Sequence, residues 1–444
     1  MSQNRLIAIG APRTKERRPR GSELTLAPLH ESPERFVLDP ARRIVERCIT
    51  RTDGTVAKTR FPLKKEFCRS SNQADLARAA DQAFLRSSAW PSLNTTGPPI
   101  KLVDLFCGCG IMSLGVWEAC RALGRSVDPV VAADFNATAI RVYKRNFPTA
   151  SVLTGNIEES LNGDLGEDPT PVEQTLVAKV GQIDLAIGGP PCQGHSDLNN
   201  HTRRSDPKNK LYDRLARFAE LVRPTHIIVE NVSAVLHDRG RVVERTAAWL
   251  KSLGYSLSEG IGEVSDIGVP QKRRRHVLVA SLTRSPNVAE WLALYHQRHR
   301  TVGWAIGDLR KLRSGVPFDE PGRATEANRK RIAYLFKEDV YELPNRLRPD
   351  CHRLKDHTYQ SVYGRMFWNQ PAQTITSGFG CMGQGRYVHP KEQRTLTPHE
   401  AARLQFIPDF FQFGADIPRT LLAEMIGNAV PVKLTYCLAL ELLR

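Results

Sequence analysis

A cysteine stands directly after two prolines in the stretch GGPPCQGHS, which spans residues 188–196. Pro190 and Pro191 fix the backbone φ angle and remove two N–H donors, while the preceding glycines leave open space in front. This arrangement presents the side chain of Cys192, and a presented thiol is a candidate nucleophile or metal ligand. The alternative is a buried structural cysteine, the commonest state of a lone cysteine. His195 alone, three residues further on, does not make a metal site, so we predict none.

Two later stretches supply an acid and a group of cations. In HIIVENV, Glu230 follows an apolar run, where its carboxylate would face the same crevice as the thiol; an acid in a surface turn is the alternative. In VPQKRRRHVLV, a period of two puts Gln271, Arg273 and Arg275 on one face of a strand. Forked guanidinium groups suit a base edge or a phosphate, and a solvated basic strand edge is the competing interpretation.

A glycine-rich turn lies nearer the N-terminus, in DLFCGCGIMSLG. Gly108 and Gly110 allow a tight turn and the close approach of a ligand, and a plain tight turn is the alternative. Asp134 ends the next apolar run, where an acid can accept hydrogen bonds from ribose hydroxyls. Phe135 can stack on a purine ring. The alternative role for Asp134 is to cap the helical pattern ATAIRVYKRNF.

The elements that must position these residues alternate along the chain from Ile100. Apolar runs rich in β-branched residues recur as IKLVDLF, PVVAADF, SVLTG, IDLAIGG, HIIVENV and HVLVASL. Helical patterns such as MSLGVWEACRALG and LYDRLARFAELVR separate several of them. The alternation predicts an α/β fold with a doubly wound, mostly parallel sheet. Ligands of such sheets bind beyond the carboxyl ends of the strands, which is where these candidate residues fall.

The same pattern predicts the domain organisation. Residues 99–283 form the main part of the α/β domain, and residues 284–395, basic and rich in Arg, Gly and aromatics, form a smaller second domain. Residues 396–444 complete the first domain with two helices, TPHEAARLQF, capped by Thr397, and PVKLTYCLALELLR. Residues 1–98 are expected to be a basic extension with one amphipathic helix, NQADLARAADQAFLRSSAW, and a linker, PSLNTTGPP.

The positive charge of the chain is unevenly distributed. The 444 residues carry a formal net charge of +16. Residues 1–98 hold 18 Lys and Arg against 10 Asp and Glu, and residues 281–395 hold 19 against 11, whereas the block between them is nearly neutral. Two basic segments suit a polyanionic partner such as nucleic acid, and a solvated surface explains the charge about equally well.

Cysteine usage and hydropathy bear on the compartment. The 9 cysteines show no CxxC spacing, which indicates neither a disulfide framework nor a structural zinc site and fits a reducing compartment. The sequence has no run of about 18 apolar residues, so we expect no membrane span. The basic N-terminus lacks the apolar stretch and cleavage site of a secretory signal. We therefore expect a cytoplasmic protein.

In their order along the chain, these stretches resemble the C5-cytosine-specific DNA methyltransferase family. The matching stretches are DLFCGCG, GGPPCQGHS, ENV, QKRRR, TPHEAARLQ and IGNAVP. The resemblance covers roughly residues 100–444, and residues 284–395 correspond to the family's variable target-recognition region. The family usually has glycine, aspartate and glutamate where this chain has Ile111, Asn156 and Asp134.

The resemblance implies methyl transfer from S-adenosyl-L-methionine to C5 of cytosine, on a Rossmann-like fold with a target-recognition domain. Cys192 would attack C6 of a flipped base, and Glu230 would hold and protonate N3. Arg275 would contact O2, with Arg273 supporting the crevice. The implied cofactor pocket contains Phe106, Gly108, Gly110, Asp134, Phe135, Asn156, Ile157, Pro190 and Asn428. The implied DNA contacts are Gln193, Ser196 and Gln271.

The leading hypothesis is therefore a DNA cytosine-5 methyltransferase of a modification or defence system. It implies double-stranded DNA as partner, other components of that system as further partners, a monomer, and a cytoplasmic, nucleoid-associated location. A tRNA cytosine-5 methyltransferase and a catalytically inactive DNA-binding regulator are the alternatives. The long basic segment 284–395 favours duplex DNA over tRNA. The presence of both Cys192 and Glu230 favours an active enzyme.

Overall fold

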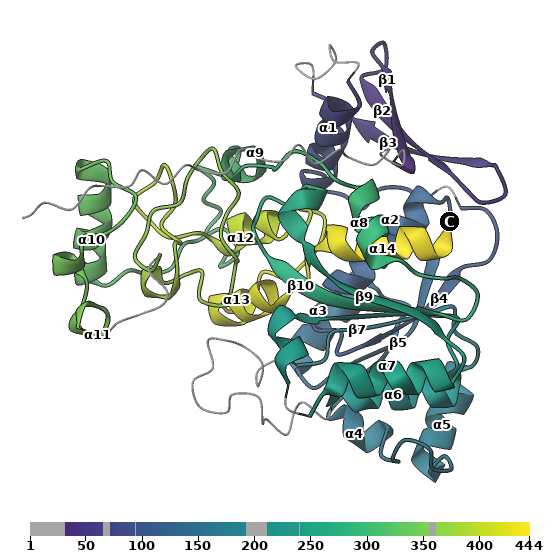
Figure 1. The fold of residues 1–444 in the computed structure, drawn as a ribbon. Helices are drawn as coiled ribbons and strands as arrows, with labels where there is room; N and C mark the ends of the chain where they lie inside the picture. The colour runs from purple at the N-terminus through teal and green to yellow at the C-terminus, as the bar shows by residue number, and fades with distance from the viewer. Residues whose placement is uncertain (1–31, 65–71, 94, 192–210, 239, 355–360) are drawn as a thin grey trace, which may run out of the picture. The chain divides into compact units, whose positions relative to one another are not determined.

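The computed structural model describes residues 32–64, 72–93, 95–191, 211–238, 240–354 and 361–444, all within one compact unit that begins at Ser32 (Figure 1). A seven-stranded sheet of order β6-β5-β4-β7-β8-β10-β9 forms its centre. The strands are β4 (Ile100–Leu105), β5 (Val127–Asp134), β6 (Ser151–Thr154), β7 (Leu185–Gly188), β8 (His226–Val232), β9 (Ser256–Glu263) and β10 (Arg274–Ser281). Pairing is parallel from β6 to β8, whereas β10 is antiparallel to both of its neighbours.

The predicted α/β fold with a mostly parallel sheet is confirmed, and each predicted strand run forms a strand. The pattern does not predict β9, because SLSEGIGE has two glycines and few apolar residues. This strand instead takes its place by pairing along its whole length with β10.

Helices cover both faces of the sheet, as the strand sequences require. Successive strand residues point to opposite faces, so Leu102 and Val103 lie in different apolar clusters. The first cluster includes side chains from α2 (Ile111–Ala122), α3 (Ala137–Asn146) and α14 (Val432–Leu443). The second includes side chains from α4 (Ile157–Ser160), α5 (Pro171–Val180), α6 (Leu211–Val222) and α7 (Val242–Ser252), and Figure 1 shows α6 and α7 on the opposite side of the sheet from α14.

The N-terminal segment differs from the expected extension. β1 (Glu34–Asp39), β2 (Ile44–Thr50) and β3 (Val56–Pro62) form an antiparallel sheet, and α1 (Gln73–Leu85) is the predicted amphipathic helix. The inward side chains of this sheet, Phe36, Val45, Ile49 and Phe61, belong to the same core as Trp117 of α2. The boundary expected at residue 98 therefore does not separate two bodies, because the described residues before it complete the core.

A buried ion pair also connects the N-terminal sheet to α2. The Nη2 atom of Arg47 on β2 donates to Glu118 on α2 at 2.7 Å, and both side chains are almost fully buried. Glu118 also accepts from Arg121, and its pKa is lowered: burial raises it, but the two guanidinium groups outweigh that effect. Removing Arg47 would take away one of two guanidinium partners of the buried Glu118 carboxylate.

We expect the chain truncated to residues 99–444 not to fold. Burial of a large apolar side chain contributes about 1.5–3 kcal/mol, and a typical domain has only about 5–15 kcal/mol of stability. Losing four such side chains removes about 6–12 kcal/mol, which is comparable with that margin before the Arg47 ion pair is counted. Soluble yield and circular dichroism check this, with a chain starting at Ser32 as the matched control. A folded 99–444 fragment would show that the N-terminal sheet is dispensable.

The segment expected to be a second domain divides between two apolar clusters. α8 (Val288–Leu294) and α9 (Val302–Ile306) contribute to the main core, as do Ala372 and Ile375 further along. A separate cluster lies around α10 (Glu326–Lys337) and is formed by Ile332, Leu335, Leu343, Val362, Tyr363, Met382 and Val388. α11 (Asp350–Arg353) follows it in the chain. The expected start at residue 284 therefore does not mark a break in packing.

The return segment forms as predicted. α12 (Pro398–Leu404) begins after Thr397, whose side chain accepts from the backbone N–H of Glu400 while the Glu400 carboxylate accepts from the backbone N–H of Thr397. α13 (Arg419–Asn428) and α14 follow it. Among the described residues, no single helix is long and apolar enough to cross a membrane, and α13 with α14 passes that test only as a pair bent by 40°.

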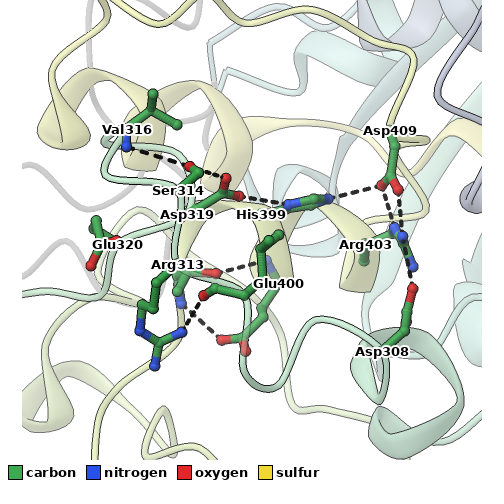
Figure 2. Close-up of polar contacts among 12 residues, drawn as sticks. Asp308, Arg313, Ser314, Val316, Asp319, Glu320, His399, Glu400, Arg403 and Asp409 are labelled. Atoms are coloured by element: carbon green, nitrogen blue, oxygen red, sulfur yellow. Dashed lines mark hydrogen bonds and ion pairs between the residues drawn. The ribbon is translucent and has the colours of Figure 1, made fainter.

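A chain of charged groups joins the return segment to the segment before α10 (Figure 2). Nδ1 of His399 lies 2.8 Å from Asp319 and its Nε2 lies 2.9 Å from Asp409. Arg403 donates to Asp409 and also reaches Asp308. Burial lowers the pKa of His399, but the two carboxylates outweigh it, so the pKa lies above its ordinary value.

The contacts of His399 with Asp319 and Asp409 make the free energy of unfolding depend on pH. Because the folded pKa of His399 is raised, its contribution is complete below its unfolded pKa of about 6.5 and is lost as pH rises through the folded pKa. We expect His399→Gln to remove that slope from the free energy of unfolding measured by urea denaturation between pH 6 and 8. His296→Gln, at an exposed histidine, is the control and should keep it. An unchanged slope in His399→Gln would contradict this account.

Candidate active site

The candidate residues meet at one edge of the central sheet. β4, β5, β7 and β8 run in parallel, so their carboxyl ends lie together. β10 runs in the opposite direction, so its first residues reach the same edge. The turn after β4, the residues after β5, the prolines after β7, the acid of β8 and the arginines of β10 are therefore neighbours.

Glu230 and Arg275 form an ion pair at this edge. Nε of Arg275 lies 2.7 Å from Oε1 of Glu230, and both side chains are mostly buried. Burial raises the pKa of Glu230 above its ordinary value, although the charges of Arg275 and Arg273 oppose this. A carboxyl group with a raised pKa holds a proton more readily than an ordinary one and is a candidate to give it to a substrate. The resemblance implies that both residues face the target base, but it did not predict the ion pair between them.

The loop that leads to Cys192 starts against Glu230. A Cβ atom added at Gly189 would lie 3.6 Å from Oε2 of Glu230, an ordinary contact distance, so the loop start lies directly beside the carboxylate. The side-chain amide of Asn231 donates to the backbone carbonyl of Pro190 at 3.3 Å. Pro190 itself is buried. Sequence reasoning did not predict the contact from Asn231, and its only signal is an amide at the end of a buried strand.

Cys192, Gln193 and Ser196 lie outside the described residues. The chain is described up to Pro191, one residue before the predicted nucleophile. The structure therefore gives the anchoring of the loop start beside Glu230, and the roles of these three residues remain predictions.

The glycine-rich turn after β4 has the left-handed backbone that its sequence predicts. The φ angles are 62° at Phe106, 51° at Gly108 and 97° at Gly110. A Cβ atom at Gly108 would meet nothing within 4 Å, whereas one at Gly110 would lie 2.8 Å from the ring of Tyr143. Gly108 thus borders open space and Gly110 permits close packing. A non-glycine residue at positive φ, as at Phe106, is a form of backbone strain that clusters at ligand sites.

A buried carboxylate that the sequence analysis did not predict, that of Asp104, lies on the strand that precedes this turn. Asp104 on β4 is fully buried and accepts from Ser113, whose hydroxyl also hydrogen-bonds Tyr143. Burial raises the pKa of Asp104 to about 8. The signal available in the sequence is an acid inside the apolar run KLVDLF.

The acid after β5 faces the same turn. Asp134 accepts from the backbone N–H of Gly108 at 2.8 Å and from that of Asn136 at 2.8 Å. Burial raises its pKa despite these hydrogen bonds. Asn136, rather than Asp134, caps α3, so the alternative role as a helix cap is wrong. Phe135 next to it is 66% exposed, which is unusual for a large aromatic and leaves its ring free to stack.

The side chains of the remaining cofactor candidates differ in whether they are free to contact a ligand. The side chain of Asn156 caps α4 by accepting from Glu158 N, and its amide nitrogen donates to the Glu158 carboxylate. Ile157 is buried. Asn428 is exposed at the end of α13, between buried neighbours. A left-handed glycine turn, an acid, an exposed ring and an exposed amide at one sheet edge fit an adenosine-bearing ligand.

Two residues of the QKRRR stretch have structural roles. Arg273 is 3% exposed, and its guanidinium donates to the carbonyls of Ile375 and Gly427 at 2.7 and 3.2 Å. Gln271 is fully buried, and all of its amide hydrogen bonds are made to protein groups. The prediction that Gln271 contacts DNA is therefore wrong, because a side chain enclosed in this way cannot reach a surface. The predicted alternation itself is confirmed, since Lys272 and Arg274 are exposed.

Known proteins resemble this chain over most of its length. A family model described as C-5 cytosine-specific DNA methylase matches residues 100–444. The Type II methyltransferase M1.BsuMI of Bacillus subtilis is 44% identical over 422 residues, which cover 95% of this chain and 98% of that protein. The Type II methylase M.HgiDII of Herpetosiphon aurantiacus is 30% identical over 358 residues, 77% of this chain and 95% of that one. The solved S. pombe Dnmt2 methyltransferase shares the fold, with a TM-score of 0.54 at 17% identity, over 78% of this chain and 98% of that one.

Proposed function

Since this chain belongs to the C-5 cytosine-specific DNA methylase family, we propose that Cys192, Glu230 and Arg275 form the reacting pocket of its DNA cytosine methyltransferase activity. The observation that carries the assignment is the Glu230–Arg275 ion pair beside the anchored start of the Cys192 loop. A proton donor, a cation and a presented thiol are what the activation of cytosine at C5 requires.

The chemical problem is that C5 of cytosine is a poor nucleophile. The Cys192 thiolate adds to C6, the π electrons of the C5=C6 bond form a C4=C5 double bond, and those of C4=N3 take up a proton from Glu230 at N3. Arg275 holds the Glu230 carboxylate and stabilises the negative charge that remains on it. C5 then has enamine character, so one difficult step is divided into easier ones.

When bound, S-adenosylmethionine would supply an electrophilic methyl group for C5, with S-adenosylhomocysteine as the leaving group. The residues that would hold this cofactor are the Phe106–Gly110 turn, Asp134 toward ribose hydroxyls, Phe135 against the adenine face, and Asn428. Loss of the proton from C5, departure of the Cys192 thiolate from C6 and return of the N3 proton to Glu230 then restore the ring and the enzyme. The basic partner of that last proton transfer lies outside this assignment.

The substrate must leave the helix before this chemistry occurs. C6 and C5 cannot be reached inside a stacked duplex, so the target cytosine is flipped into the pocket. We propose that the basic segment 284–395 recognises the target sequence. The arginines and lysines of this segment would bind the phosphate backbone of the DNA. On this proposal, Gln193 and Ser196 contact DNA near the flipped base.

The named relatives suggest a biological setting. M1.BsuMI and M.HgiDII are both Type II methyltransferases, and we propose that this chain likewise acts in a restriction-modification system with other components of that system as partners. A monomer acting at the nucleoid in the cytoplasm is part of the same proposal. The description of the family as a DNA methylase favours DNA over tRNA, and the intact Glu230–Arg275 pair favours an enzyme over an inactive regulator.

The test is product formation on competing substrates. The purified chain, incubated with labelled S-adenosylmethionine, is expected to place label in 5-methylcytosine of duplex DNA and not in tRNA. Bisulfite sequencing of the same DNA reports the target sequence. Label in tRNA alone would replace the substrate assignment, and label in neither would reject the function.

A further inference from the structure

Two buried glutamines form a junction under the proposed active site. Gln271, which precedes β10, and Gln405, which follows α12, are both fully buried. Nε2 of Gln271 donates to Oε1 of Gln405 at 2.7 Å and to the carbonyl of Leu404 at 3.0 Å. Each amide is therefore in direct contact with the other, and neither reaches the surface.

The partners fix the orientation of both amides. Oε1 of Gln271 accepts from the backbone N–H of Ile375 at 2.8 Å, so its Nε2 must face Gln405. Nε2 of Gln405 in turn donates to the carbonyls of Ile426 and Ala429, at 2.7 and 3.4 Å. A reversed amide would place like groups against each other in a buried site, where an unsatisfied polar atom is costly.

The pair links two segments that have different proposed tasks. Ile375 belongs to the segment 372–377, which lies within the proposed target-recognition region 284–395 and is bound through the backbone of Ala372 to residues 270–272, just before β10. Ile426 and Ala429 flank Asn428, which is proposed to contact the cofactor. The two glutamines therefore connect the cofactor side with the target-recognition side through side-chain amides alone.

Two further contacts repeat the same link. Arg273 donates to the carbonyls of both Ile375 and Gly427. A Cβ atom at Gly427 would lie 2.1 Å from the backbone nitrogen of Ser377, so the two segments touch directly and only glycine fits there. A displacement of the turn that carries Asn428 must therefore move the segment 372–377 or break buried hydrogen bonds.

We propose that Gln271 and Gln405 are positioning residues that couple occupancy of the cofactor site to the order of the segment 372–377. The proposal rests on the proposed function only in placing Asn428 at the cofactor. Ligand that holds the Asn428 turn stabilises the Gln405 hydrogen bonds to Ile426 and Ala429, and through Gln271 it holds the amide of Ile375. By thermodynamic reciprocity, ordering of that segment by a bound target strengthens cofactor binding.

Amide hydrogen exchange, with S-adenosylhomocysteine as the probe, tests this in the full chain without DNA. In the wild type the probe is expected to slow exchange both in residues 106–110 and in residues 372–377, the latter at least about fivefold, the lower end of usual coupling factors. In Gln405→Leu, protection of 106–110 should remain while that of 372–377 falls below about twofold. A residue that served only the fold would affect both segments together.

Tyr255→Phe is the matched control, because it removes a buried hydrogen bond to the carbonyl of Pro224, at 2.7 Å, away from this junction. It should keep both protections. If Gln405→Leu does not fold, Gln405→Met takes its place, because methionine keeps the unbranched side chain, has no amide and tolerates irregular packing, and the same comparison decides.

Protection of 372–377 that persists in either folded glutamine variant overturns the proposal, as does its absence in a wild type that shows protection at 106–110. A wild type with no protection at 106–110 rejects the cofactor site itself and the proposal with it. Methylation assays on duplex DNA report separately on the proposed function.

Discussion

Cys192→Ser is expected to abolish methylation of duplex DNA while leaving the protein folded. A serine hydroxyl is almost fully protonated at neutral pH and is a far weaker nucleophile than a thiolate, so addition to C6 stops. Removal of an enzyme nucleophile typically reduces kcat by about 10⁴–10⁶-fold, and a loss of that order is expected here. Transfer of labelled methyl groups to duplex DNA measures it.

The control for this variant is Cys48→Ser, at a half-exposed cysteine on β2 of the N-terminal sheet. It makes the same chemical change away from the candidate site and should keep the wild-type rate. DNA binding by Cys192→Ser, measured by fluorescence anisotropy, should be within a few-fold of wild type. A serine variant that still methylates at more than a few per cent of the wild-type rate would assign the nucleophile elsewhere.

Glu230→Gln is expected to lower kcat by about 10²–10⁴-fold, the usual contribution of a general acid. Glutamine keeps the shape of the side chain and an oxygen that can accept from Arg275, but it cannot give a proton to N3. Because the pKa of Glu230 is raised, the wild-type rate should fall as pH rises through that pKa, and the variant should lack this limb of the profile. Single-turnover rates between pH 5 and 9 measure both effects.

The stability of this variant separates catalysis from folding. A carboxyl group whose folded pKa is raised binds its proton more tightly in the folded state, so wild-type stability falls as pH rises through that pKa. Glu230→Gln should therefore be at least as stable as the wild type at pH 8. Glu259→Gln on β9, an acid paired with His276 at 3.0 Å, is the matched control and should keep kcat. Equal kcat losses in both variants would argue against a specific proton donor.

The fold was predictable where apolar runs marked buried strands and where helix caps had a clear signature. The five parallel strands and β10 follow from the alternating pattern, and α12 begins at the predicted cap, Thr397. The N-terminal sheet was not predictable, because its strands are short, carry many charges and bury only alternate residues. Its role depends on contacts with α2 and α14, which lie far away in the sequence.

The site was predictable to the extent that strand ends gather candidate residues. Glu230 and Arg275 were both expected at the crevice, and they meet in an unpredicted ion pair because β8 and β10 are adjacent and antiparallel. Alternation correctly put Gln271 on the face of Arg275, but the pattern could not show that Gln405 and Ile375 enclose it. Tertiary burial of a polar group leaves little trace in local sequence, which is why the DNA contact assigned to Gln271 was wrong.

The central claim is that the Cys192 sulfur bonds to C6 of a flipped cytosine, and trapping that bond tests it most directly. A duplex with 5-fluorocytosine at the methylated position lets addition and methyl transfer occur, but fluorine at C5 cannot leave as the proton does. With S-adenosylmethionine present, we predict a covalent protein–DNA complex whose digested peptide carries the nucleotide on Cys192, and no complex with Cys192→Ser. An adduct on another residue, or none from a preparation that methylates ordinary DNA, would contradict the mechanism.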